Sequence, residues 1–166
     1  MKKSLPTYGR LVMALTSVLL VAAAGCSSLG GGSKSVGELH LFGLPTALTV
    51  AGSSVAGGVG VRIYASEAGG SRGIPIKKGQ LEILMFDQSA AGLDPQKDKP
   101  LKTWTLKASE LDAFVSATMV GAGYQLELKW DKEAPTGKVF TVVARYRNPG
   151  KPDVYSAPAA IAIATY

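Results

Sequence analysis

The chain carries few side chains of the kinds that act as nucleophiles or bind zinc. Cys26 is its only cysteine and His40 its only histidine. A Ser–His–Asp or Cys–His mechanism would need His40 as its base, and zinc sites usually need several His or Cys ligands. We therefore predict a non-enzymatic protein with no catalytic residue, no cofactor and no metal site.

Acidic residues gather in one predicted loop, where they could bind calcium. Asp87, Asp94 and Asp98 supply the oxygen ligands that calcium prefers. Their spacing matches no EF-hand, and Lys97 and Lys99 lie among them, so we favour a solvated loop. A two-carboxylate glycosidase would need acidic side chains that face each other across a cleft, and the sequence alone does not show such a pair. A carboxylate-based hydrolase is therefore the weaker alternative.

Two basic pairs could contact anionic lipid, a glycan or a partner. They are Lys77 with Lys78 and Arg145 with Arg147. Arg145 and Arg147 share one face of a predicted strand, which makes them the better pair. The alternative is that all four are outward charges of the usual kind, which discourage strand edges from aggregating.

Aromatic residues could form a face on which a carbohydrate stacks. The candidates are Trp104, Tyr124, Trp130 and Tyr146. They fall on the inward phases of predicted strands, so core packing is the favoured interpretation.

Residues 1–25 have the three zones of a secretory signal. Lys2, Lys3 and Arg10 give a positive start without an acidic residue. Residues 11–24 are apolar or small, and this run is shorter than the about 20 residues that a membrane-spanning helix needs. Small residues follow where a peptidase would cut.

The signal ends in Val21-Ala22-Ala23-Ala24-Gly25-Cys26, which resembles the lipobox of bacterial lipoproteins. The resemblance implies that Cys26 becomes the acylated first residue of the mature protein, held on a membrane by its acyl chains. A lipobox usually has Leu where this chain has Ala23, and cleavage after Ala24 by an ordinary signal peptidase is the alternative. Ser27 follows the cysteine instead of Asp, which favours the outer membrane over the inner by the sorting rule of enteric bacteria.

The remaining chain divides into a tether and a domain. Residues 26–37 hold the lipidated cysteine and a Gly/Ser-rich tether, and residues 38–166 form the domain. Removing the signal leaves 141 residues, enough for one core. It also leaves 15 basic against 12 acidic side chains, so the net charge is +3 instead of +6. That small charge and the export signal argue against nucleic-acid binding.

Short alternating segments predict the fold of the domain. Strands are expected at 44–50, 59–65, 81–86, 103–106, 124–130, 138–147 and 154–166. A helix is expected to begin at a Ser109 cap and to end by Gly121 or Gly123. His40 would lie at the edge of the tether. Six or seven strands with one short helix predict an antiparallel β-sandwich, with a small β-barrel as the alternative.

Segments such as 60–64, 79–87 and 142–146 look similar to bacterial lipoproteins with a single sandwich domain. The likeness to immunoglobulin-type and transthyretin-type sandwiches is one of fold and implies no activity. The first hypothesis is therefore a membrane-anchored module that binds another cell-envelope component, a protein partner, through a sheet edge or loops. A glycan-binding or small-ligand-binding lipoprotein is the alternative. An exposed apolar patch would favour the partner, and a deep cleft with an exposed Trp or Tyr would favour the ligand.

Overall fold

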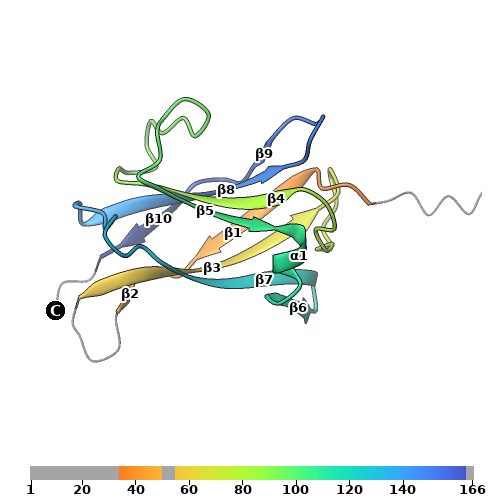
Figure 1. Cartoon of the computed structure of the whole chain (residues 1–166), viewed down its shortest axis with the longest axis horizontal. Helices are drawn as coiled ribbons and strands as arrows, with labels where there is room; N and C mark the ends of the chain where they lie inside the picture. The colour runs from red at the N-terminus through yellow and green to blue at the C-terminus, as the bar shows by residue number, and fades with distance from the viewer. Residues whose placement is uncertain (1–33, 50–54, 164–166) are drawn as a thin grey trace, which may run out of the picture. The chain divides into compact units, whose positions relative to one another are not determined.

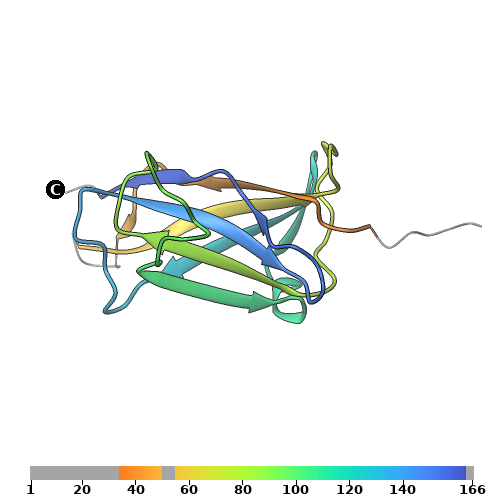
Figure 2. The same cartoon turned by 90° about the horizontal axis from the view of Figure 1, so that it is seen from above.

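Two antiparallel sheets pack face to face in the computed structural model, which describes residues 34–49 and 55–163 (Figures 1 and 2). The predicted β-sandwich is thereby confirmed. A compact unit of the chain starts at Lys34. The predicted signal, Cys26 and most of the tether lie outside the described residues. No helix in residues 34–49 and 55–163 is long and apolar enough to cross a membrane.

Sheet A has the strand order β1-β3-β7-β6, with β2 paired to β3. Its strands are β1 (Glu38–Gly43), β2 (Leu48–Thr49), β3 (Ala56–Ser66), β6 (Val115–Thr118) and β7 (Gly121–Lys129). Sheet B has the order β10-β8-β4-β5, with β9 paired to β8. Its strands are β4 (Gln80–Phe86), β5 (Lys102–Lys107), β8 (Val139–Arg147), β9 (Val154–Tyr155) and β10 (Ala159–Ala162).

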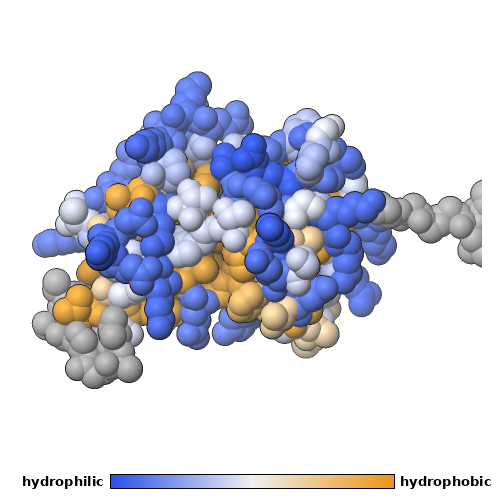
Figure 3. Space-filling model, viewed as in Figure 1, coloured by the Kyte–Doolittle hydropathy of each residue, from blue (hydrophilic) through white to orange (hydrophobic). Residues whose placement is uncertain are grey.

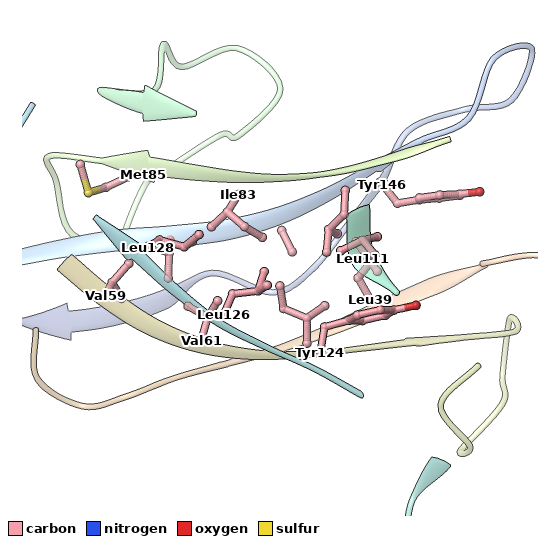
Figure 4. Close-up of a cluster of buried hydrophobic side chains, with 14 of the residues drawn as sticks. Leu39, Val59, Val61, Ile83, Met85, Leu111, Tyr124, Leu126, Leu128 and Tyr146 are labelled. Atoms are coloured by element: carbon pink, nitrogen blue, oxygen red, sulfur yellow. The ribbon is translucent and has the colours of Figure 1, made fainter. Parts of the chain in front are cut away.

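The core lies between the sheets because each strand alternates its side chains between two faces. On β3, Val59, Val61 and Ile63 point inward and are buried. Aliphatic and aromatic side chains from both sheets meet them (Figure 4). The predicted burial of aromatics is confirmed for Tyr124, Trp130 and Tyr146, whereas Trp104 is only partly buried against the core.

Both long sides of the sandwich are closed by hydrogen bonds between the sheets. On one side, the indole N–H of Trp104 donates to the Lys129 carbonyl at 2.9 Å, and Lys102 Nζ donates to the Trp130 carbonyl at 2.9 Å. On the other, the N–H of Ala47 donates to the Ala162 carbonyl at 2.9 Å. These links fix the two sheets against each other.

The predicted short helix is confirmed, but it begins earlier and is shorter than predicted. Helix α1 (Ala108–Leu111) follows Lys107, whose N–H donates to the Glu110 carboxylate at 2.6 Å. Leu111 fills the core, whereas Phe114 and Val115 remain exposed. A second helical turn would therefore gain no burial of apolar side chains in the core. The chain instead pairs with β7 as strand β6.

The ends of the domain also differ from the prediction. His40 lies within β1, opposite Tyr64, and not at the edge of a tether. The single strand expected at 154–166 is two short strands, β9 and β10, on either side of Pro158, which cannot donate to a ladder. The strand expected at 44–50 is reduced to β2 in its described part.

Candidate binding face on sheet A

The outer face of sheet A carries cross-strand rows of mixed chemistry. Phe42 of β1 lies opposite Arg62 of β3, which lies opposite Gln125 of β7. His40 lies opposite Tyr64 in the neighbouring row. These side chains share one face because successive residues of a strand alternate.

A hollow of about 730 Å³ lies over these rows. Its apolar lining comes from Phe42, Leu44, Leu48 and Val120, with polar groups around it from His40, Arg62, Gln125 and Glu127. Glu127 is the single carboxylate among the described residues that line it. The hollow is therefore mainly apolar and lacks a facing pair of acids.

Two outward glycines let neighbouring side chains lie flat on the sheet. A Cβ added at Gly60 would come within 2.7 Å of Leu44 Cδ1. One added at Gly123 would come within 2.7 Å of Tyr64 Cε1. Larger residues would push Leu44 and Tyr64 away from the sheet, so the glycines help to shape the hollow.

Large apolar side chains on this face remain open to water. Phe42 is 61% exposed and Leu44 48% exposed. The Phe42 ring meets the Tyr64 ring edge-on, with centroids 6.1 Å apart. In Figure 3, hydrophobic surface gathers in the lower part of the view, over β2, β3, β7 and β6. Exposed apolar patches of this kind mark interaction sites in soluble proteins.

The charged groups of this face are weakly engaged. Arg62 donates from Nη2 to Gln125 Oε1 at 3.1 Å and forms no ion pair within the described part of the chain. His40 Nε2 lies 3.3 Å from Ser66 Oγ and 3.7 Å from a carboxylate oxygen of Glu38. Arg62 is thus available to an anionic group of a partner.

The arginines singled out from the sequence lie on sheet B, away from this face. Arg145 forms an ion pair with the buried Glu82 and lies over the Tyr155 ring. Burial alone would lower the pKa of Arg145, but hydrogen bonds to Tyr155 and Glu82 and the Glu82 charge raise it above its ordinary value. Arg147 is half-exposed and lies within 3.6 Å of Glu82 and 3.5 Å of Asp153. Both arginines therefore have internal partners.

Lys77 and Lys78, which were also predicted as contact residues, have different surroundings. Lys77 pairs with Asp112 at 3.1 Å on the surface. Lys78 exposes its side chain, and its carbonyl accepts a hydrogen bond from the Tyr146 hydroxyl at 3.0 Å. The structure does not join either of them to the Arg145 ion pair.

The acidic loop serves local structure. A hydrogen bond from the Thr136 hydroxyl, and then others from the backbone of Thr136 and Gly137, lower the pKa of Asp87. Asp94 pairs with Lys97 at 2.9 Å, and Asp98 accepts from the Asp94 N–H at 2.8 Å. Within residues 34–49 and 55–163, no three His, Cys, Asp or Glu side chains come together as a metal site would require.

Two signals in the sequence mark this face, and neither entered the prediction of a site. Gly60 interrupts an otherwise regular strand, which often marks a close approach or a site. Leu39 and Leu41 alternate with His40 and Phe42, which is typical of a strand with one exposed face.

These features define an antiparallel β-sandwich whose sheet A has an open, mainly apolar outer face. No protein-family model, no curated protein and no solved structure matches the chain.

Proposed function

We propose that the protein is a lipid-anchored module of the bacterial cell envelope, without enzymatic activity, that binds a protein partner on the outer face of sheet A. The anchor is the acylated Cys26, and the outer membrane is the favoured location. The observation that carries the binding role is the open apolar hollow built around Phe42 and Leu44.

The composition of this face supports a protein partner. Protein interfaces are enriched in aromatic residues and arginine and depleted in lysine. Phe42, Tyr64 and Arg62 meet in neighbouring rows, and no lysine lines the hollow among the described residues. Exposed aromatics and arginine are also the side chains that most often dominate binding energy.

The edge strand β6 of the same sheet suggests that the partner binds through an extended segment. Strand β6 pairs only with β7 in the described structure, and its sequence Val-Ser-Ala-Thr carries no charge and no proline. The edge strand of sheet B, β5, instead carries Lys102 and Lys107 at its ends. An uncharged edge next to an apolar face suits addition of a strand.

A small apolar ligand is the second candidate, and the size of the hollow favours it. Ligand pockets usually enclose about 300–1,000 Å³ and are lined mainly by apolar groups with a few polar ones. The hollow falls in this range at about 730 Å³. Its mostly open shape and exposed Phe42 make the protein partner the better account.

The partner is tested by placing a photo-crosslinking amino acid at Phe42 in the full chain, expressed in its native envelope. The same amino acid at Lys99, an exposed position on the loop before β5, is the matched control. We expect a protein adduct at position 42 that is absent at position 99 and is lost with Arg62→Glu. A small-molecule adduct at position 42 would favour the second candidate, and equal adducts at both positions would contradict a binding role for this face.

A further inference from the structure

The hairpin between β6 and β7 has an unusual tip. Thr118 pairs with Gly121, so only Met119 and Val120 form the connection. Two-residue hairpin loops usually contain Asn, Asp or Gly, because these residues tolerate the turn and solvent. Met119 is fully exposed here and Val120 is half exposed. Two apolar side chains thus project from the end of the domain without a covering segment in the described residues.

The start of the domain lies at the same end as this tip. The Gly37 N–H donates to the Ser66 carbonyl at 2.8 Å, just before the loop that leads to Gly73. The Gly73 N–H then donates to the Val120 carbonyl at 2.7 Å. The end of β3 therefore links the first described residues to the hairpin, and Figure 2 shows β1 beginning at the end where this loop lies.

The chain between Cys26 and the domain is short. Seven residues, 27–33, separate Cys26 from Lys34. Even when this segment is fully extended, the distance from the Cα atom of Cys26 to that of Lys34 is at most about 28 Å. An anchor on Cys26 therefore holds this end of the domain near the lipid surface, while the far end, with the turn after β7, can point away.

Charged side chains of both signs surround the apolar tip at this end. Lys34 and Arg72 are exposed and positive, and Glu67 is exposed and negative. Glu38 is partly buried, accepts a hydrogen bond from the Gly69 N–H and lies near His40. These two acids balance these two bases, whereas Lys77 and Lys78, which precede β4 at the same end, add positive charge, with Lys77 paired to Asp112.

We propose that the Met119–Val120 tip docks into the surface of the membrane that holds the lipid anchor. This inference rests on the proposed acylation of Cys26. Apolar side chains at such an interface settle about 5–10 Å into the boundary between headgroups and acyl chains. Because Val120 also lines the hollow, docking places one end of the binding face next to the membrane and sets its orientation toward a membrane-bound partner.

The test uses the full chain acylated at Cys26 and reconstituted into phosphatidylcholine vesicles. Acylation consumes the single native thiol, so Met119→Cys takes an environment-sensitive dye at the tip. Lys132→Cys, exposed in the turn after β7, is the matched control at the far end. We expect blue-shifted emission at 119 and quenching by aqueous iodide at least about threefold weaker than at 132, because a docked tip lies below the headgroups.

A second readout leaves the tip unlabelled. Ser71→Cys, exposed beside the hairpin, is treated with a bulky water-soluble thiol reagent. We expect faster modification when Met119→Asp and Val120→Asp are added, because charged side chains would lift this end from the lipid. Equal quenching at 119 and 132, with no change at Ser71→Cys, in a chain that carries acyl mass and floats with vesicles would overturn the docking alone. A chain without acyl mass would instead refute the anchor.

Discussion

The two outer faces of the sandwich differ in what covers them. On sheet B, Leu84, Phe86 and Val143 form a small second core beneath Leu93 and Tyr155. Next to that core, the Glu82 carboxylate is buried and paired with Arg145. Sheet A has comparable apolar residues on its outer face, but they border an open hollow.

This contrast is the main support for the proposed binding role of sheet A. Covering an apolar sheet face stabilises a domain, and the loop before β5 and strand β9 achieve that on sheet B. Sheet A keeps Phe42 and Leu44 open, although their burial would be favourable. An exposed apolar face that is shaped by glycines and carries no ion pair of Arg62 in the described residues supports the proposed binding of a partner.

Two phenylalanines test the contrast most strongly. Phe86 is 1% exposed on the outer face of sheet B, and Phe42 is 61% exposed on that of sheet A. We expect Phe86→Ala to lower the free energy of unfolding by about 3–5 kcal/mol and Phe42→Ala to change it by less than about 0.5 kcal/mol. Urea denaturation measures both. Equal losses would mean that sheet A is covered in solution.

Two glutamates give the electrostatic version of the same comparison. Glu82 is buried and paired with Arg145, whereas Glu127 is exposed and lines the hollow. Glu82→Ala leaves the partly buried Arg145 without its main partner. We therefore expect the free energy of unfolding to fall by about 3 kcal/mol, the lower end of the range for buried pairs. Glu127→Ala should change stability by less than about 0.5 kcal/mol. A small effect of Glu82→Ala would show that water replaces the carboxylate.

Asp87 is expected to make the stability of the domain sensitive to acid. Its carboxylate holds the Thr136 hydroxyl at 2.6 Å and the Gly137 N–H at 3.1 Å. These bonds lower its folded-state pKa below the ordinary value of about 4, so their stabilisation is present above that pH and lost as the pH falls through the lowered value. Because the group is exposed, we expect Asp87→Asn to cost only about 1 kcal/mol at pH 7.

Thermal unfolding of Asp87→Asn beside the wild type, from pH 7 to pH 2, checks this expectation. The difference between the two proteins should begin to shrink below about pH 4, where the Asp87 carboxylate of the unfolded chain becomes protonated, and should vanish once the pH has fallen through the lowered pKa of the folded state. A difference that stays constant to pH 2 would assign the effect to packing and not to charge.

Gly60→Ala should have the smallest effect on stability while still reshaping the open face. The new methyl group would displace the Leu44 side chain, which is free to move on the surface. We expect a stability change within about 0.5 kcal/mol, because strands tolerate Ala slightly better than Gly. Partner binding, measured with the adduct-forming protein from the Phe42 experiment, should weaken severalfold. Unchanged binding would place the partner elsewhere on sheet A.

The sequence predicted the parts of this molecule that local pattern determines. Period-2 alternation placed β3 and β7 correctly, because each buries one face. It failed between Asp112 and Thr118, where the apolar spacing indicated that the helix continues but pairing with β7 formed strand β6 instead. The prediction also failed at His40. The short alternating segment of β1 directly follows the Gly/Ser-rich tether, and it was therefore not recognised as a strand.

Gly60 and the alternation in residues 39–42 do not by themselves distinguish this face from the covered face of sheet B. Outward residues of β4, such as Leu84 and Phe86, are as apolar as Phe42. Whether such a residue is covered depends on segments distant in the chain, including Leu93 and Tyr155 on sheet B. The basic residues Arg145 and Arg147 looked available because their partner Glu82 lies on another strand.

The anchor supports both the proposed function and the docking of the hairpin, and one measurement tests it directly. Intact mass and membrane fractionation are determined for the full chain expressed in a bacterial host, beside Cys26→Ala. We predict acyl mass on a wild-type chain that begins at Cys26 and floats with membranes, and neither property in the variant. A soluble wild-type chain cleaved after Ala24, with a free thiol on Cys26, would contradict the account.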